Sequence, residues 1–441
     1  MIVHIRIILF FLFFYTASSP ASPNIEYWTT TKGTDVYYVY SPELPMVDIE
    51  VVFDAGSIRD SNTLGIAMLT NSLLAEGADG DDADTISSGF ESLGAIYASD
   101  TGYDSASLHL RSLTQNELFT KAMENFKKVI SKPDFPKDAF ERKRSQMLIG
   151  VKAKQQSPGT LAKDKFMSAI YRSHPYGKPS EGNEKTIKSI KRENVISFYD
   201  KYYTAKNSII AIVGAVDRQA AEQIAEDIVS SLKEGEKADL LTKVKKLDEP
   251  KDIFIEYPSA QTHVLVGQPG VRRGDSDYFS LYVGNHILGG GGMVSRLFEE
   301  IREKRGLSYS AYCYFSPMLF KGPFIASLQT KTSQVDEAIS VLLENIKKYI
   351  ADGPTQDELI AAKKNIIGGF PLRIDSNSKI LNYVAVIGYY KLPLDYLDTF
   401  NNNVEEVTID NIKDAFKRRL SPEKFVTVRV GRSPEKIHED K

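Results

Sequence analysis

Residues 285–314 read NHILGGGGMVSRLFEEIREKRGLSYSAYCY, and this stretch carries three structural signals in tandem. An apolar helix end reaches Leu288, and the four glycines after it turn the chain where any Cβ would crowd the backbone. Apolar residues then recur at helical spacing up to Gly306, the expected C-cap. Beyond it, Leu307 opens a run that alternates in the manner of a strand. The stretch therefore predicts helix, glycine turn, helix and strand.

Two side chains in this stretch are candidates for binding a ligand. Arg302 lies in the last turn of the second predicted helix, and Tyr309 lies at the start of the predicted strand. A guanidinium and a phenol aimed into one cleft would both donate hydrogen bonds to peptide carbonyls. The alternative is that Arg302 belongs to a solvated helix face and that Tyr309 packs within the strand.

Length and composition bound the class of protein. The chain has 441 residues, which favours two or three domains, with 42% hydrophobic and 26% charged residues as in soluble globular proteins. Its formal net charge is −3, so no sustained basic field exists to release counterions from nucleic acid. We therefore expect no nucleic-acid partner.

The amino terminus has the outline of a secretory signal peptide. Arg6 precedes an apolar run, residues 7–15, which is too short to span a bilayer as a mature helix. Small residues follow, and we expect cleavage after Ala21. The expectation is an exported, periplasmic protein with no membrane attachment after cleavage.

The two halves of the chain repeat one order of predicted elements. Asn71 aligns with Asn285 and Gly94 aligns with Gly306, and the two offsets agree within two residues. This agreement indicates an internal duplication. The predicted fold class is α+β, with two homologous domains that each contain a mostly antiparallel sheet covered by helices on one face.

The domain boundaries follow from this repeat and from composition. Residues 233–251 are charged, with one glycine and one proline, and are predicted to form a linker. The expected order is signal peptide 1–21, N-terminal domain 24–232, linker 233–251, C-terminal domain 252–432 and tail 433–441.

Four motifs give the sequence a resemblance to a known family. The stretch around 284–310, TGYDSASLHLRSL at 101–113, SHPYGKP at 173–179 and IIGGFPLRIDSNSKIL at 366–381 are similar to the insulinase or pitrilysin family of zinc peptidases, in its processing-peptidase-like bacterial form. The resemblance covers nearly the whole chain after the first two dozen residues. It implies that Arg302 and Tyr309, seven residues apart, contact the substrate and the oxyanion of the reaction.

The zinc-binding motif of that family is replaced here. The resemblance implies a helix carrying His-x-x-Glu-His, and the flanking residues set the register so that these positions are Met68, Asn71 and Ser72. A third ligand, a glutamate on a later helix, is replaced by Ile149 or by Gly150. A thioether, an amide, a hydroxyl and an aliphatic group do not hold Zn²⁺, which binds imidazole, thiolate or carboxylate.

No other group of residues offers a metal site. The six histidines include no pair at a spacing of three or four residues, and Glu76 is a single carboxylate near the replaced motif. The one cysteine, Cys313, forms no internal disulfide and is expected to pack in the core. We therefore expect no metal or other cofactor in this chain.

The resemblance and the missing ligands together predict that two different chains share the work of binding and cleaving the substrate. The chain is expected to be the substrate-binding, non-catalytic subunit of a heterodimeric zinc metalloendopeptidase. Its partners would be a peptide substrate and an active homologue that carries His-x-x-Glu-His and the zinc ion. Alone, the chain is not expected to catalyse proteolysis. The alternative is a peptide-binding or scaffolding protein with no role in hydrolysis.

Overall fold

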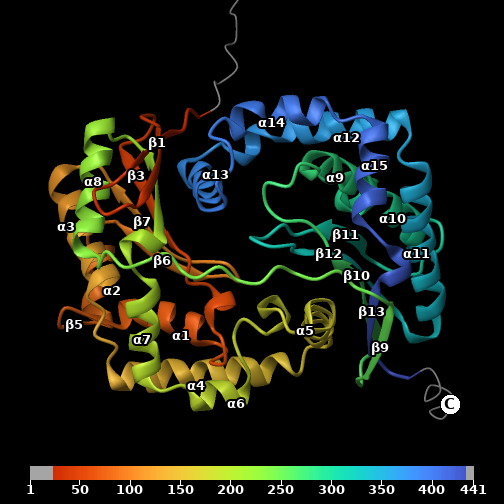
Figure 1. Cartoon of the computed structure of the whole chain (residues 1–441), viewed down its shortest axis with the longest axis horizontal. Coiled ribbons are helices and arrows are strands. Elements are labelled where there is room, and N and C mark those ends of the chain that lie inside the picture. The colour runs from red at the N-terminus through yellow and green to blue at the C-terminus, as the bar shows by residue number, and fades with distance from the viewer. Residues whose placement is uncertain (1–22, 434–441) are drawn as a thin grey trace, which may run out of the picture.

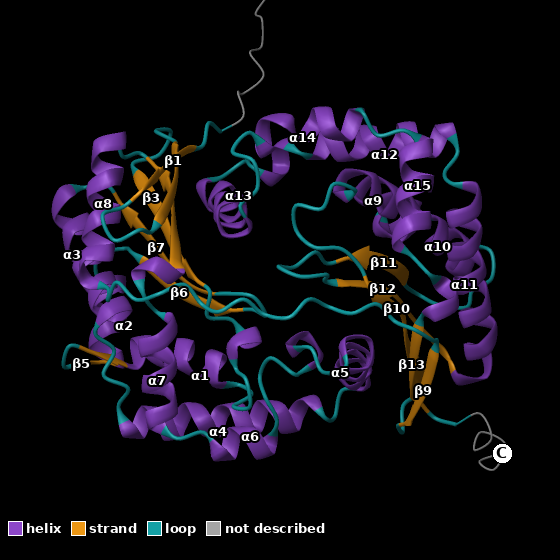
Figure 2. Ribbon diagram, in the orientation of Figure 1, coloured by secondary structure: helices purple, strands orange, loops and turns teal. Residues whose placement is uncertain are grey.

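The computed structural model describes residues 23–433, and these residues form two β-sheets that face each other across the molecule (Figure 1). Helices cover the outside of both sheets (Figure 2). The fold class predicted from the sequence is thereby confirmed: each half is a sheet with a helical layer.

The N-terminal sheet has six strands in the order β1-β2-β8-β3-β7-β6. All its neighbouring strands are antiparallel except β2 and β8. The strands are β1 Glu26–Thr29, β2 Asp35–Tyr40, β8 Ser208–Gly214, β3 Met46–Phe53, β7 Ala106–Leu113 and β6 Ile96–Thr101. A separate small hairpin consists of β4 Gly77–Ala78 and β5 Asp81–Asp82.

The C-terminal sheet has five strands in the order β11-β12-β10-β13-β9. Here β13 and β9 are parallel and the other neighbours are antiparallel. The strands are β11 Ala311–Phe315, β12 Pro323–Lys331, β10 Gln261–Pro269, β13 Val426–Gly431 and β9 Lys251–Glu256. Strand for strand, this order and these directions match β6-β7-β3-β8-β2. The matched topology is compatible with the predicted internal duplication, which remains a prediction about descent.

The helices lie mainly on the outer faces of the two sheets (Figure 2). Those of the N-terminal half are α1 Ile66–Leu73, α2 Ala83–Glu91, α3 Asn116–Ser131, α4 Lys137–Lys154, α5 Pro158–Tyr171, α6 Glu184–Ser189, α7 Arg192–Tyr202 and α8 Arg218–Ser231. Those of the C-terminal half are α9 Tyr278–Asn285, α10 Arg296–Phe298, α11 Val335–Asp352, α12 Gln356–Gly369, α13 Asn377–Tyr390, α14 Tyr396–Glu405 and α15 Ile409–Arg419.

Two helices are exchanged between the halves. The C-terminal helix α13 packs on strands β8, β3 and β2 of the N-terminal sheet, and the N-terminal helix α5 packs on β13 and β10 of the C-terminal sheet (Figure 1). The α13 contact is close, because a Cβ on Gly388 would lie 2.6 Å from the Tyr37 ring. Each sheet is therefore covered on its inner face by a helix from the other half, which the sequence did not predict.

A buried carboxylate joins the halves at the end of α13. Asp104, in the turn between β6 and β7, is only 4% exposed. Its side chain accepts hydrogen bonds from the Tyr176 hydroxyl, from the Leu319 N–H at 2.8 Å and from the Tyr390 hydroxyl at 2.8 Å. The Tyr389 hydroxyl donates to the Asp104 carbonyl oxygen at 2.8 Å. Burial raises the pKa of Asp104 even though these donors favour its charged form.

The segment between the halves is packed although it has no regular structure. Residues 233–250 contain no helix or strand, and β9 begins at Lys251, the last residue of the predicted linker. The Ala238 N–H donates to the Asn207 side chain of the N-terminal half at 2.8 Å, and Leu247 is buried in one hydrophobic cluster with Ile325 and Val428 of the C-terminal sheet. The segment is therefore fastened to both halves.

Some sequence predictions differ from the structure or fall outside it. The strand predicted from Leu307 begins only at Ala311, because the Ser308 hydroxyl and the Thr330 hydroxyl bond the backbone at 310 and 307 and hold these residues in an irregular segment. The predicted signal peptide lies outside the described residues, as does the tail beyond Ser433. Between residues 23 and 433, no helix is both long and apolar enough to cross a membrane.

Removing one hydrogen-bond donor from the buried Asp104 carboxylate tests whether it stabilises the contact between the two halves. We expect Tyr390→Phe to lower the free energy of unfolding by about 1–3 kcal/mol, because Asp104 loses a hydrogen bond that water cannot replace. Urea unfolding followed by circular dichroism measures this change. The control is Tyr40→Phe, on an exposed ring without a hydrogen bond to the described residues, for which we expect a change within about 0.5 kcal/mol. Equal free energies of unfolding for the two variants would contradict a stabilising role for the hydrogen bonds to Asp104.

Candidate functional site

Helix α1 carries the replaced zinc-motif positions, and its start is fixed by a buried aspartate. The Asp60 carboxylate accepts hydrogen bonds from the Gly65 N–H at 2.7 Å and from the Ala67 N–H at 3.0 Å. Burial raises the pKa of Asp60 to about 7. Gly65 has a φ of 93°, and a Cβ there would lie 2.7 Å from the Glu181 carbonyl oxygen. The helix is thus anchored to the loop that precedes α6.

The side chains at the motif positions on α1 make structural contacts. Asn71 is 4% exposed, and its amide group donates to the Tyr203 hydroxyl at 3.3 Å and to the Ser107 carbonyl at 3.4 Å. The Ser72 hydroxyl donates to the Leu69 carbonyl at 2.9 Å, within its own helix. Met68 is half-buried. None of these three groups offers zinc a carboxylate, an imidazole or a thiolate.

The position of the third ligand is apolar. Ile149 lies on α4, the helix that packs beside α1, and its side chain is 68% exposed. The neighbouring position, Gly150, is exposed and has no side chain. The structure therefore brings the two helices of the motif together, but the side chains at the motif positions offer no atoms that bind zinc.

The nearest carboxylate, Glu76, is already engaged. It pairs with Arg142 at 2.5 Å and with Lys143 at 2.7 Å, both on α4. Burial acts to raise its pKa, but these two cations hold the pKa below its usual range. Within residues 23–433, no three His, Cys, Asp or Glu side chains gather closely enough to hold a metal ion. The residues of this site do not fit zinc.

The second candidate site lies on the segment that follows the glycine run. A π-helical turn, Glu299–Glu303, carries Arg302, and Tyr309 lies between that turn and β11. The Arg302 guanidinium stacks 4.2 Å from the Tyr309 ring centre and 4.8 Å from that of Phe298. The Tyr309 side chain is 78% exposed. The two predicted residues therefore meet and face solvent, and Tyr309 does not pack within a strand.

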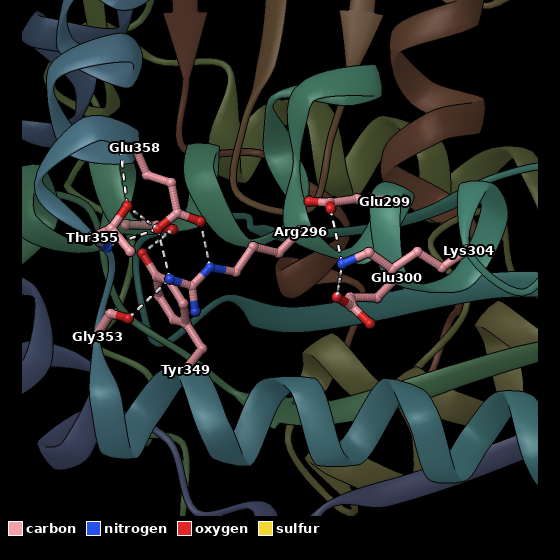
Figure 3. A network of polar contacts seen from close by, with 9 residues as sticks. Arg296, Glu299, Glu300, Lys304, Tyr349, Gly353, Thr355 and Glu358 are labelled. Atoms are coloured by element: carbon pink, nitrogen blue, oxygen red, sulfur yellow. Dashed lines mark hydrogen bonds and ion pairs between the residues drawn. The ribbon is translucent and has the colours of Figure 1, made fainter.

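The charges around Arg302 are paired with one another and leave Arg302 without a counter-ion. Lys304 pairs with Glu299 at 2.9 Å and with Glu300 at 2.7 Å (Figure 3). Arg305 pairs with Glu300 at 2.6 Å. In the described part of the chain, no acidic group pairs with Arg302. Its N–H groups remain available to an acceptor from outside the chain.

A half-buried ion pair fixes this segment to the helical layer. The Arg296 guanidinium forms two bonds with Glu358, at 2.5 and 2.6 Å, and a third with the Gly353 carbonyl at 3.1 Å (Figure 3). It also lies 4.9 Å from the centre of the Tyr349 ring. Sequence reasoning missed this anchor, because Glu358 is 62 residues from Arg296 and no local spacing connects them.

The glycine run allows the helices and strand of this segment to approach closely. A Cβ on Gly289 would lie 2.6 Å from the backbone nitrogen of Cys313, on β11. Gly306 ends the π-helical turn with a φ of 61° and donates to the Arg302 carbonyl at 2.9 Å, as expected of a C-cap. The predicted crowding is therefore confirmed at Gly289, and the predicted helix end at Gly306 and the burial of Cys313 agree with the structure. Gly292 differs, because a Cβ there would meet no atom within 4 Å, and its φ of 64° is what favours glycine.

The chain matches two models of one peptidase family and is similar to solved structures. The model of the insulinase family, peptidase family M16, matches residues 35–184, and the model of the peptidase M16 inactive domain matches residues 189–366. A crystal structure of a peptidase M16 inactive domain from Pseudomonas fluorescens is 38% identical, with a TM-score of 0.90 over 93% of this chain and 98% of that chain. The fold is also that of a protease from Helicobacter pylori, with a TM-score of 0.84 at 20% identity over 92% and 99% of the two chains.

Curated relatives include proteins with and without a peptidase name. An uncharacterized zinc protease of Rickettsia bellii is 27% identical over 84% of this chain and 90% of its own length. The non-peptidase homolog YmxG of Helicobacter pylori is also 27% identical, over 87% and 88% of the two chains. With its sheets, its motifs and its missing zinc ligands, the chain belongs to the insulinase family, peptidase family M16, as a homologue of the inactive kind.

Proposed function

We propose that this chain is the substrate-binding, non-catalytic subunit of a heterodimeric zinc metallopeptidase. The observation that carries the proposal is the contrast between its two candidate sites. The side chains at the zinc-motif positions are not metal ligands, whereas Arg302 and Tyr309 lie together, Tyr309 is exposed, and no acidic group among residues 23–433 pairs with Arg302. A homologue with an intact His-x-x-Glu-His motif would supply the zinc ion, and this chain would hold the peptide.

The exposed pair suits a peptide backbone. Arg302 has several N–H donors in a plane, and stacking on Tyr309 and Phe298 restricts its orientation. A hydrogen bond from such a cation to a carbonyl, or to the oxyanion formed from it, contributes about 1.5–3 kcal/mol. The Tyr309 hydroxyl would provide a second donor beside it.

The neighbouring surface offers further contacts for an extended chain. Strand β11 is the end strand of the C-terminal sheet, but its outer edge is partly covered, because the Cys313 carbonyl accepts a hydrogen bond from the Asn285 side chain at 3.1 Å and Gly289 lies against the Cys313 nitrogen. Tyr312 and Tyr314 stack along it and are 44% and 36% exposed. Met293 and Val294, just after the glycine run, are 75% and 80% exposed. These exposed side chains support a peptide as the ligand, and they also fit the alternative of peptide binding without hydrolysis.

The compartment is part of the proposal. We infer export to the periplasm from Arg6 and the apolar run 7–15, which lie outside the described residues. We therefore propose that the catalytic partner is also an exported homologue, since the two subunits must meet in one compartment.

Metal analysis tests the absence of a zinc site. We expect the purified chain to contain much less than one zinc per molecule and to cleave no peptide, because its motif positions lack donors. We expect the variant Met68→His, Asn71→Glu, Ser72→His, Ile149→Glu to acquire zinc, since residues 68 and 72 lie on one face of α1 beside α4.

The matched control retains Ile149 and has only the three changes on α1, so we expect it to bind zinc more weakly. Stoichiometric, tightly bound zinc in the unmodified chain would refute the proposal. Failure of the fourfold variant to bind zinc would show that the assigned register is wrong.

Kinetics of the reconstituted pair test the shared site. We expect mixing with the catalytic homologue to restore cleavage, and Arg302→Ala or Tyr309→Phe in this chain to lower kcat/KM by about tenfold to a hundredfold, as loss of a charge-assisted hydrogen bond predicts. The control is Arg305→Ala, on a nearby arginine that is already paired with Glu300. If both site variants retain full kcat/KM, the chain acts as a scaffold.

A further inference from the structure

A cavity of about 170 Å³ lies where the segment between the halves meets the C-terminal half. Its lining includes Lys245 and Lys246 from that segment, Lys321 from the loop before β12, Arg418 and Arg419 from the end of α15, and Lys424. Six cationic side chains from four separate parts of the sequence thus surround one small space. The formal charge of the whole chain is −3, so this concentration is local.

The two arginines are neutralised by nearby aspartates. Arg418 pairs with Asp277 at 2.7 Å and with Asp414 at 2.7 Å. Arg419 pairs with Asp275 at 2.6 Å and with Asp277 at 2.5 Å. These pairs hold the arginines at the wall of the cavity.

The four lysines are not neutralised. None of Lys245, Lys246, Lys321 and Lys424 forms an ion pair or a side-chain hydrogen bond with another residue in the range 23–433. Lys321 and Lys424 are half-buried, so water compensates their charge less well than at an open surface. Burial, with repulsion from Lys246 and Arg419, lowers the pKa of Lys321 despite the attraction of Asp275. The cationic groups around the cavity therefore repel one another.

The uncommitted groups that line the cavity are hydrogen-bond donors. The lysine ammonium groups are donors only, and the Ser421 hydroxyl has no partner among the described residues. The one side-chain amide, Gln268, is already engaged: its oxygen accepts from the Ser421 N–H at 2.8 Å and its nitrogen donates to the Arg419 carbonyl at 2.9 Å. A ligand that complements this lining has several acceptor oxygens and more than one negative charge.

We propose that this cavity binds a small, multiply charged oxyanion of the phosphate class. The anion joins Lys245 and Lys246 of the connecting segment to Lys321 and Lys424 of the C-terminal half, and so fastens that segment in place. The ligand is free phosphate or the phosphate group of a nucleotide, which present the same oxygens. This site is independent of the proposed peptidase function.

Titration of the full chain with inorganic phosphate tests the site. We expect calorimetry to show binding, and we expect phosphate to raise Tm more than sodium chloride does at the same ionic strength, because a bound ligand stabilises the folded state. In the double variant Lys321→Gln, Lys424→Gln we expect phosphate affinity to fall about tenfold to a hundredfold.

A matched pair of lysines provides the control. Lys347 and Lys348 are exposed on α11, and neither pairs with a described residue. The variant Lys347→Gln, Lys348→Gln removes the same charge away from the cavity and should bind phosphate as the unmodified chain does. In chloride alone, the Lys321→Gln, Lys424→Gln variant should have an equal or higher Tm, since repulsion inside the cavity is relieved; this measurement shows that it folds.

The two sources of the anion are distinguished by a parallel titration with ADP. Equal affinities for phosphate and ADP support free phosphate, and binding of ADP more than tenfold tighter supports a nucleotide, with loss of both in the cavity variant. The proposal is overturned if chloride reproduces the phosphate effect, or if the Lys321→Gln, Lys424→Gln variant binds phosphate as tightly as the control.

Discussion

The exchange of α5 and α13 between the halves is the constraint on which the rest of the structure depends. Each helix packs on the inner face of the sheet that the other half supplies. The apolar residues on those faces are therefore buried only when both halves are present and correctly oriented. The buried Asp104 strengthens the same constraint, because its donors come from the N-terminal half, from the loop before β12 and from α13. The packing of the hydrophobic core therefore fixes the orientation of the two halves relative to each other.

This constraint holds two sites of different character in one molecule. On the N-terminal side, α1 and α4 pack together at the replaced zinc-motif positions, while Asn71 and Glu76 are committed to hydrogen bonds and ion pairs inside the chain. On the C-terminal side, the ion pair of Arg296 with Glu358 fixes the segment, and Arg302 forms no ion pair with any of the residues that the structure describes. The lack of metal ligands at one site and the accessible guanidinium at the other are the two observations behind our proposal that this chain holds a substrate for another subunit.

Much of the fold could be predicted from local pattern. The spacing of apolar residues before Gly306 predicted a helix, and the structure has helical turns there from Arg296 to Glu303. Gly306 could be assigned as a helix end because a left-handed residue is needed there. The start of β11 was predicted four residues early, because side-chain hydrogen bonds at Ser308 and Thr330 override the alternation. That Arg302 and Tyr309 lie close together was suggested by their places at the end of the predicted helix and the start of the predicted strand, and the family resemblance added their expected role.

By itself, the sequence determined which side chains stand at the zinc-motif positions and therefore which metal-binding atoms they offer. Met68, Asn71, Ser72 and Ile149 cannot supply zinc ligands in any fold, since the donor atoms are missing from the side chains. The tertiary structure alone decided the exchange of α5 and α13, the donors around Asp104, and the meeting of six cations at one cavity. Those features join residues separated by tens to hundreds of positions, and local sequence pattern carries no information about which distant side chains become neighbours once the apolar faces are buried.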